Sequence, residues 1–209
     1  MAETFAIWKP KGISSFKGLG QVRRAYPGEK VGHAGTLDPL AEGILVVAVG
    51  RAATKELHTK VAAEKEYLAE ITFGVRSATD DAEGPLTPTE KPIEIDKEEL
   101  ELAIQENTGE IEQIPPAHSA IHINGKRAYE LARKGEKVKM KPRQVLVKSA
   151  KLESFTWPTA TVRYITGPGV YIRSLARDLG EELGCGAYMS ALTRTRVGEY
   201  TKEDVKDFS

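Results

Sequence analysis

The stretch GHAGTLDPLAEGILVVAVG, residues 32–50, sets three glycines, a histidine and an Asp-Pro step ahead of an apolar run. Residues 44–50 form a short unbroken apolar segment bounded by glycines. Such a segment lacks the alternation of a half-exposed strand, so it predicts a strand that is buried on both faces. The sequence therefore predicts that one carboxylate, Asp38, is presented by a tight turn at the start of a buried strand.

The turn around Asp38 is rigid by composition. Asp38 precedes Pro39, which restricts its backbone to extended conformations. Gly32, Gly35 and Gly43 allow tight bends or the close approach of another molecule. A preorganised site needs such support, but a purely structural turn has the same pattern. On these residues alone, the structural and the catalytic interpretations are equally supported.

Length and composition limit the class of protein. A chain of 209 residues with 40% hydrophobic and 29% charged residues is typical of one soluble globular domain. No apolar run approaches the roughly 20 residues needed to cross a bilayer, and the N-terminus does not resemble a signal peptide. Cys185, the only cysteine, excludes an internal disulfide and lies between glycines, which indicates a small buried structural residue. We therefore expect a cytoplasmic protein.

The formal net charge of zero hides two opposed regions. Residues 91–112 carry eight acidic and two basic residues, whereas residues 126–151 carry ten basic and two acidic residues. One such run is usually a solvated face. Two opposed runs close together indicate a polarised surface, and the basic run is a candidate for phosphate contact.

Hydrophobic patterns predict an irregular mixture of helices and strands, which favours the α+β class over a doubly wound parallel sheet. Ser14 or Ser15 is a candidate N-cap for the first helix, and residues 75–95 are expected to form a long loop. The expected strands are 4–8, 44–50, 65–74, a hairpin within 143–167, and 188–200. The expected helices are about ten residues ending at 27–28, then 51–62, 95–109, 126–135 and 170–184.

Several common chemistries lack their motifs. Neither a G-x-x-x-x-G-K-[ST] loop nor a G-x-G-x-x-G motif is present, so we expect no nucleotide cofactor. His118 and His122 have a zinc-like spacing only on a helix, and the prolines before them indicate an extended segment. There, four residues span roughly 13 Å, too far for one metal. We therefore expect no metal site.

Five blocks in this chain resemble the TruB family, the bacterial synthases that make pseudouridine in the T loop of tRNA. They are WKPKGISS, GHAGTLDPLAEGILVVAVGRAATK, KEYLAEITFG with TDDAEG, PPAHSAIHINGKRAYELARKGE, and YIRSLARDLGEELGCGAYMSALTRTRVG. The resemblance implies a pseudouridine-synthase fold, with a mixed, largely antiparallel central sheet flanked by helices. It also implies one catalytic domain over 1–209, with an RNA-facing insertion at roughly 110–145.

The implied reaction is the isomerisation of uridine 55 in the T arm of tRNA, without a cofactor. Because the net charge is zero, we expect binding to rely on a local basic face, for which a monomer suffices. Asp38 matches the family's essential aspartate, which either attacks the sugar or removes a sugar proton. Tyr67 matches a tyrosine that stacks on the base and helps remove the C5 proton. Arg173 matches an arginine that pairs with the aspartate, and an adjacent guanidinium favours an ionised carboxylate.

The resemblance also implies residues that bind the substrate. His33 matches a histidine that fills the space left by flipped nucleotides, although a buried or turn-capping histidine explains it equally well. Leu192 matches a leucine beside the base, and core packing explains it equally well. Gly35 and Tyr171 are also expected to bind the substrate, and Lys126, Arg127 and Arg133 are expected to contact phosphates of the T arm.

The sequence departs from the family pattern in three places. GPGVY stands where relatives have a Ser/Lys-Gly-Thr-Tyr run, and His118 and His122 replace an aromatic residue and a lysine. The chain also stops soon after TRVGEYTKEDVKDF, where many relatives continue into a small C-terminal RNA-binding domain of the PUA type. We therefore expect no such domain here, and weaker tRNA binding than in longer relatives.

Two other functions remain open at this point. One is an RNA-binding module or tRNA-folding chaperone that has lost catalysis. The joint presence of Asp38, Tyr67 and Arg173 argues against it, because binding alone needs none of them. The other is a synthase that acts on a different structured RNA.

Overall fold

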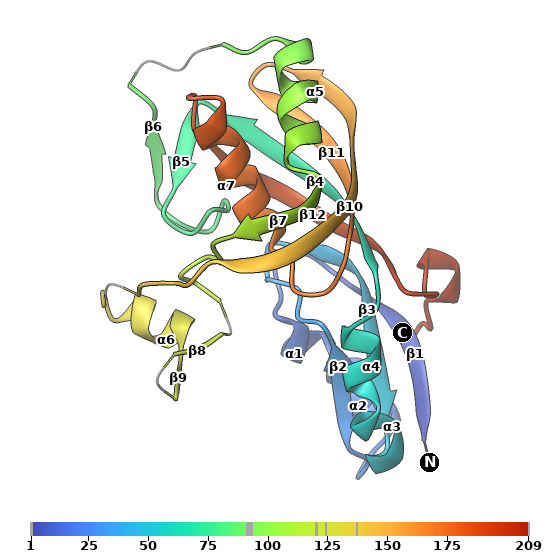
Figure 1. Cartoon of the computed structure of the whole chain (residues 1–209). Coiled ribbons are helices and arrows are strands. Elements are labelled where there is room, and N and C mark those ends of the chain that lie inside the picture. Colours follow the sequence, from blue (N-terminus) through green and yellow to red (C-terminus); the bar gives the residue numbers. More distant parts are fainter. Residues whose placement is uncertain (1, 91–93, 120, 124, 137, 209) are drawn as a thin grey trace. The chain divides into compact units, whose positions relative to one another are not determined.

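The structure, a computed structural model, describes residues 2–90, 94–119, 121–123, 125–136 and 138–208 (Figure 1). The strands are β1 (Glu3–Lys9), β2 (Val31–Ala34), β3 (Glu42–Val49), β4 (Lys65–Phe73), β5 (Val75–Ser77), β6 (Leu86–Pro88), β7 (Gly109–Gln113), β8 (His122–Ile123), β9 (Lys126–Arg127), β10 (Arg143–Thr156), β11 (Thr159–Thr166) and β12 (Ala187–Val197). The α-helices are α1 (Ser15–Gly18), α2 (Gly20–Ala25), α3 (Arg51–Lys55), α4 (Leu57–Val61), α5 (Lys97–Glu106), α6 (Ala128–Arg133) and α7 (Ile172–Glu182).

The main sheet has the strand order β1-β3-β12-β4-β11-β10-β7, and β2 pairs with β3 off this path. The pairs β1–β3, β2–β3 and β7–β10 are antiparallel, whereas β12 and β3 are parallel. This mixed, mostly antiparallel sheet with helices confirms the α+β prediction. The chain divides into two compact units, described separately below: unit 1 comprises Met1–Leu68, Arg163–Pro168 and Ala191–Ser209, and unit 2 comprises Ala69–Val162 and Gly169–Ser190.

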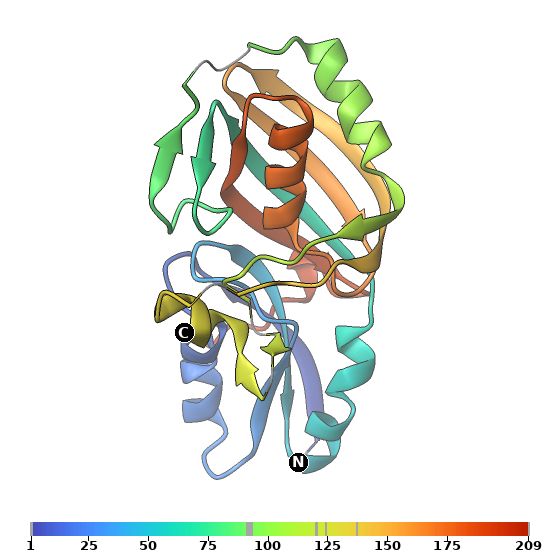
Figure 2. The same cartoon turned by 60° about the vertical axis from the view of Figure 1, so that its left-hand side comes forward.

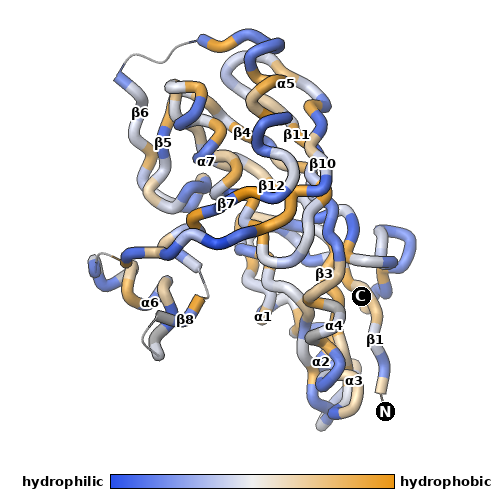
Figure 3. Tube along the Cα trace, viewed as in Figure 1, coloured by the Kyte–Doolittle hydropathy of each residue, from blue (hydrophilic) through white to orange (hydrophobic). Residues whose placement is uncertain are grey.

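Strand β3 forms the centre of unit 1 and is buried on both faces, as its sequence predicted. Leu45, Val47 and Val49 pack in one apolar cluster with Leu19 and Val22. Ile44 and Val46, which alternate with them, pack in a second cluster that includes Val197 and the partly buried Leu57. Because each face of β3 is covered, its residues 44–49 are all apolar (Figure 3).

The helices of unit 1 lie on opposite faces of these strands (Figure 2). We predicted one helix of about ten residues before Pro27, but the structure has two short ones, α1 and α2. Leu19 separates them, serving as C-cap of the first and N-cap of the second, and its side chain is buried. The stretch 51–62 is likewise divided into α3 and α4.

Unit 2 packs α5 and α7 beside each other, with α5 also against β10 (Figure 2). Leu100, Ala103 and Ile104 of α5 are buried, as are Leu175 and Leu179 of α7. A capping box begins α5: Asp96 accepts a hydrogen bond from the backbone of Glu99, whose side chain in turn accepts one from the backbone of Asp96. Helix α7 and the β10–β11 strands match their predicted positions.

Some short strands were missing from the predictions. Residues 75–95 contain the short hairpin β5–β6, and residues 91–93 of that stretch lie outside the described residues. Strands β2 and β7 were not predicted, because Val31–Ala34 and Gly109–Gln113 are short and rich in glycine or charge.

Cys185 is fully buried, as expected. Within the described residues, no helix is long and apolar enough to cross a membrane.

Candidate active site

Asp38 lies in the loop between two paired strands of unit 1. Strands β2 and β3 are antiparallel, with His33 opposite Val47 and Ala34 opposite Val46. The connecting loop turns at Gly35, whose φ is +76°, and closes with a hydrogen bond from the amide of Ala41 to the carbonyl of Asp38 at 3.1 Å. Asp38 itself is half-buried. The predicted turn is therefore the connection of a hairpin whose second strand is the most buried of the unit.

A buried arginine ties together the two ends of this loop. Arg194 on β12 is 1% exposed, and its Nε donates to the carbonyl of Ile44 at 2.8 Å while its Nη2 donates to the carbonyl of Gly35 at 3.0 Å. The backbone of Arg194 also lies against Gly43, where a Cβ would come within 2.2 Å of the Arg194 carbonyl oxygen. Gly43 is therefore required for the close parallel pairing of β3 and β12.

Burial and neighbouring positive charge lower the pKa values of two side chains of unit 1, His33 and Lys65. Burial, followed by the charges of Arg194 and Arg23, lowers the pKa of His33. Its Nδ1 is buried and has no hydrogen-bond partner among the described residues. Burial, followed by the charge of Arg194, lowers the pKa of Lys65 to about 8, while its Nζ donates to the carbonyls of Val61 and Ala63. At neutral pH His33 is therefore an uncharged imidazole.

Tyr67 and Leu192 lie on neighbouring strands, β4 and β12. Both side chains are buried, with exposed fractions of 7% and 8%. A hydrogen bond of 2.9 Å from the Thr195 hydroxyl to the Glu66 carboxylate links the same two strands. Tyr67 and Leu192 are therefore placed by the sheet itself rather than by a loop.

Arg173 lies in the first turn of α7 in unit 2 and is 5% exposed. Its Nη1 lies 3.3 Å from Oδ2 of Asp81 and donates to the carbonyl of Thr79 at 3.2 Å. Its Nη2 donates to the carbonyl of His118 at 3.1 Å. Arg173 is thus a buried guanidinium held in place by a carboxylate and two carbonyls, rather than a solvent-exposed side chain.

Asp81, which sequence reasoning did not single out, is the partner that holds Arg173 within unit 2. It is 1% exposed and accepts hydrogen bonds from the Thr79 hydroxyl at 2.6 Å and the Glu83 amide at 3.0 Å. Gly84 makes this turn possible, because a Cβ there would come within 2.4 Å of the Thr79 hydroxyl oxygen. The Asp-Asp step before a glycine in TDDAEG was the signal that could have identified it.

Tyr171 is the N-cap residue of α7, directly before Ile172. The buried side chain of Gln113 accepts from its amide at 2.8 Å and donates to its carbonyl at 3.1 Å. The guanidinium of Arg143 lies over its ring, 4.9 Å from the centroid. One residue of the basic run therefore contacts the segment that carries Arg173.

The basic run of residues 126–151 presents charge to solvent in unit 2. Arg127 is exposed at the N-cap of α6, and Lys126 and Arg133 lie at the start of β9 and the end of α6. The structure does not describe the side chains of Lys126 and Arg133. Among the lysines of the run whose side chains the structure describes, the exposed ones are Lys134, Lys139, Lys141, Lys148 and Lys151.

The two units divide the predicted site residues between them. Unit 1 holds His33, Gly35, Asp38, Tyr67 and Leu192; unit 2 holds Lys126, Arg127, Arg133, Tyr171 and Arg173. The expected pairing of Asp38 with Arg173 joins residues of different units and stays a prediction. Among the described residues, no group of three or more His, Cys, Asp or Glu side chains is arranged to hold a metal ion.

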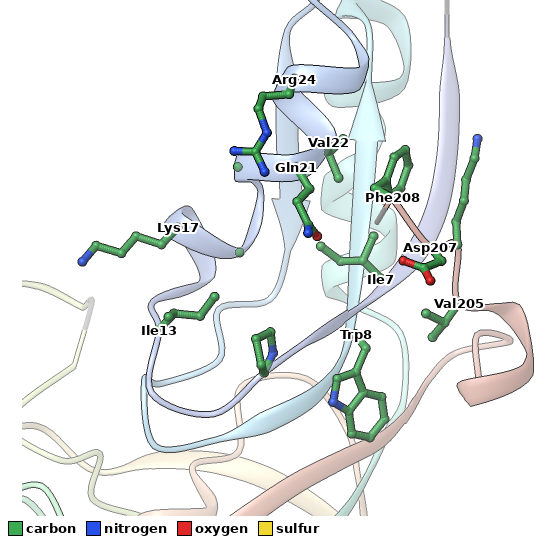
Figure 4. A pocket seen from close by; sticks show the side chains of 14 residues that line it. Ile7, Trp8, Ile13, Lys17, Gln21, Val22, Arg24, Val205, Asp207 and Phe208 are labelled. Atoms are coloured by element: carbon green, nitrogen blue, oxygen red, sulfur yellow. The ribbon is translucent and has the colours of Figure 1, made fainter.

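Unit 1 also contains a pocket of about 490 Å³ with a different lining (Figure 4). Trp8 and Ile7 of β1, Lys17 of α1 and Arg24 of α2 contribute to its lining, together with Phe208. None of the predicted site residues lines it. The candidate catalytic residues are therefore not the residues that line this pocket.

Comparison with known sequences identifies the family of this chain. A sequence profile described as TruB family pseudouridylate synthase (N terminal domain) matches residues 23–172. A second, described as tRNA pseudouridylate synthase B C-terminal domain, matches residues 173–208. Fold and sequence therefore define a pseudouridylate synthase class of protein. Within that class, the chain belongs to the TruB family.

Individual relatives cover most of this chain. It is 44% identical over 198 residues to a tRNA pseudouridine synthase B of Cutibacterium acnes, covering 92% of this chain and 66% of that protein. It is 41% identical over 205 residues to a tRNA pseudouridine synthase B of Bacteroides fragilis, covering 95% of this chain and 88% of that protein. The chain thus spans about two thirds of the length of the first relative.

A solved structure has a similar fold. The crystal structure of a Cbf5-Nop10-Gar1 complex matches with a TM-score of 0.73 and 28% sequence identity. The match covers 95% of this chain and 50% of that one. Together with the sequence matches, this similarity confirms the predicted pseudouridine-synthase fold.

Proposed function

We propose that this chain isomerises uridine 55 in the T loop of tRNA to pseudouridine, acting on the T arm as a monomer and without a cofactor. The observation that carries the proposal is the position of Asp38. In a chain of the TruB family, Asp38, the one carboxylate of the connection between β2 and β3, is held on a hairpin braced by the buried Arg194.

The reaction breaks the N1–C1′ bond of the uridine, turns the detached base, and forms a C5–C1′ bond. The C5 proton leaves and N1 gains a proton, so that no atom is gained or lost overall. Asp38 acts at the sugar, either as nucleophile or as base. Tyr67 stacks on the base and assists removal of the C5 proton, and its burial on a strand suits a fixed stacking surface.

Arg173 keeps the carboxylate of Asp38 ionised and oriented in this proposal, because an adjacent guanidinium favours the charged form. The contacts of Arg173 with Asp81 and with two carbonyls fix the guanidinium, which preorganises it for this role.

Binding requires that the stacked uridine be flipped out of the T loop, at a cost of about a few kcal/mol. His33 fills the vacated space as a neutral imidazole, consistent with its lowered pKa. Arg127 and the exposed lysines of residues 126–151 contact phosphates of the T arm, which adds affinity without reading the base sequence.

The test is to incubate the protein with an unmodified T-arm stem-loop and to map pseudouridine by chemical labelling and primer extension. We expect one modified position, uridine 55, and no product from a stem-loop that carries cytidine there. The Asp38→Ala variant should bind the stem-loop but form no product. Binding without conversion by the unchanged protein, or conversion only of another RNA, would overturn the proposal.

A further inference from the structure

The N-terminal segment of unit 1 holds the backbone on both sides of Asp38. The Ser15 hydroxyl donates to the carbonyl of Leu37 at 2.8 Å and accepts from the amide of the same residue at 2.8 Å. The amide of Gly12 donates to the carbonyl of Pro39 at 2.7 Å. The residues immediately before and after Asp38 are therefore both bound to residues 12–15.

The Ser15 hydroxyl is available for this because its neighbour begins the helix. The Ser14 hydroxyl accepts from the amide of Lys17 at 3.3 Å and is the N-cap of α1. Ser15 and Leu37 are 2% and 3% exposed. The contact is therefore shielded from solvent, and its loss would remove these partners from the amide and the carbonyl of Leu37.

We propose that Ser15 is a positioning residue for the Asp38 carboxylate, a role that rests on the proposed function. Leu37 precedes Asp38, so its backbone sets the direction in which the Asp38 side chain leaves the loop. A hydroxyl donates and accepts at once, which fixes the amide and carbonyl of Leu37 together. Ser15 thus acts on the reaction through backbone geometry and does not itself contact the uridine.

The first test measures the contact without catalysis. Amide hydrogen exchange at Leu37 should be at least about tenfold faster in Ser15→Ala than in the unchanged protein. Ser14→Ala is the matched control, because it removes the adjacent hydroxyl and the helix cap but leaves the Leu37 contacts intact. Exchange at Leu37 that is unchanged in Ser15→Ala would overturn the proposal whether or not the protein modifies RNA.

The second test measures turnover on the T-arm stem-loop. Ser15→Ala should lower kcat by about tenfold or more with KM and RNA affinity unchanged, since small misplacement of a reacting group is costly. Ser15→Thr, which keeps the hydroxyl, should recover part of the rate, and Ser14→Ala should retain it. Equal kcat in Ser15→Ala and the unchanged protein, or equal losses in both alanine variants, would contradict the positioning role.

An independent observation concerns the next residue, Phe16. Phe16 is 67% exposed, and the guanidinium carbon of Arg23 lies 4.0 Å from its ring centroid. Arg23 also donates to the Phe16 carbonyl at 3.1 Å, which holds the two side by side. A large exposed aromatic side chain backed by arginine is the arrangement on which unpaired nucleic-acid bases stack.

The surrounding charge indicates which partner Phe16 fits. Residues 9–28 contain five lysines and arginines and no acidic residue. Lys17 and Arg24 are exposed, and Figure 4 shows them extending from α1 and α2. Phe16 also follows Ser15, whose side chain bonds to the residue before Asp38. The aromatic surface thus lies in a basic segment close to the candidate catalytic loop.

We infer that Phe16 stacks on an unpaired base of the RNA that carries the target uridine, which again rests on the proposed function. Phe16→Ala should weaken equilibrium binding of the T-arm stem-loop at least about fivefold, whereas Phe16→Trp should preserve it. Leu102→Ala is the matched control, because Leu102 is 61% exposed but lies on the acidic helix α5. Tight binding by the unchanged protein with equal affinity in Phe16→Ala would overturn this inference alone; no binding by the unchanged protein would contradict the proposed function as well.

Discussion

The guanidinium of Arg173 and the carboxylate of Asp81 form an ion pair of 3.3 Å in which both side chains are buried. Removing one partner of a buried pair is costly, because the remaining charge is left without compensation. Asp81→Ala should therefore lower the free energy of unfolding by about 3–5 kcal/mol, and it should also lower turnover. Asp81→Asn should reduce the free energy of unfolding by less. Denaturant unfolding and T-arm modification assays measure these effects.

The control for this prediction is an exposed pair in the same unit. Arg76 and Glu181 lie 2.7 Å apart, and nearly half of each side chain is exposed. Glu181→Gln should change the free energy of unfolding by less than about 1 kcal/mol and leave turnover unchanged. Equal losses in Asp81→Ala and Glu181→Gln would mean that the burial of the Arg173–Asp81 pair has no energetic consequence.

Lys65 gives unit 1 a distinctive pH dependence. Its pKa falls from the ordinary 10.5 to about 8 in the folded protein, through burial and the charge of Arg194. Between these pH values the unfolded chain binds more protons than the folded one, so stability increases as the pH rises. Lys65 should therefore raise the free energy of unfolding by about 3 kcal/mol between about pH 8 and pH 10.5, and add no pH dependence below about pH 8.

Subtracting the unfolding curve of Lys65→Met isolates this contribution from other groups that titrate at alkaline pH. We expect the stability of the unchanged protein relative to the variant to increase from about pH 8 to pH 10.5. Parallel curves for the two proteins would show that Lys65 keeps its ordinary pKa after folding.

Gly43 should tolerate no side chain. Its φ is +116°, and a Cβ would approach the Arg194 carbonyl oxygen to 2.2 Å. Gly43→Ala should therefore cost more than about 4 kcal/mol or prevent folding, because the strain adds to a backbone clash. Gly28 has a φ of +81° but open space around it, so Gly28→Ala should cost only about 1–2 kcal/mol. Thermal unfolding of both variants distinguishes clash from strain; similar melting temperatures would contradict the close approach of Arg194.

Arg127 is the described basic residue best placed to test phosphate contact. Arg127→Ala should weaken T-arm binding similarly for different stem sequences and reduce the slope of log affinity against log salt by about one. Lys97→Ala on the acidic helix α5 is the control, since Lys97 is also exposed but has acidic neighbours. A sequence-dependent loss, or an unchanged salt slope, would exclude a simple phosphate contact by Arg127.

The sequence was most informative where one local pattern determines the structure. The apolar run 44–50 predicted β3 because burial on both faces removes the need for polar residues, and Pro39 with three glycines predicted the turn that presents Asp38. Periodicity also located α5 and α7, whose buried apolar residues recur at helical spacing. The family resemblance predicted the pseudouridine-synthase fold, which no single local pattern could predict.

The sequence was least informative where partners are distant along the chain. Arg173 meets Asp81 across more than ninety residues, and Arg194 meets Gly35 across 159, so no local pattern signals either contact. Ser14 and Ser15 were equivalent candidates for the helix cap, and only the fold shows that Ser14 caps α1 while Ser15 binds Leu37. The break between α1 and α2 likewise follows from burying Leu19 against β3.

The most direct test of the central claim compares two carboxylates of the same loop region in single-turnover conversion of the T-arm stem-loop. Asp38→Asn preserves size and removes the charge, whereas Glu42→Gln makes the same change at the start of β3. With RNA binding equal in all three proteins, Asp38→Asn should form no pseudouridine, and Glu42→Gln should react at nearly the rate of the unchanged protein. Pseudouridine formation by Asp38→Asn at a rate similar to that of Glu42→Gln would contradict the assignment of Asp38 as the catalytic carboxylate.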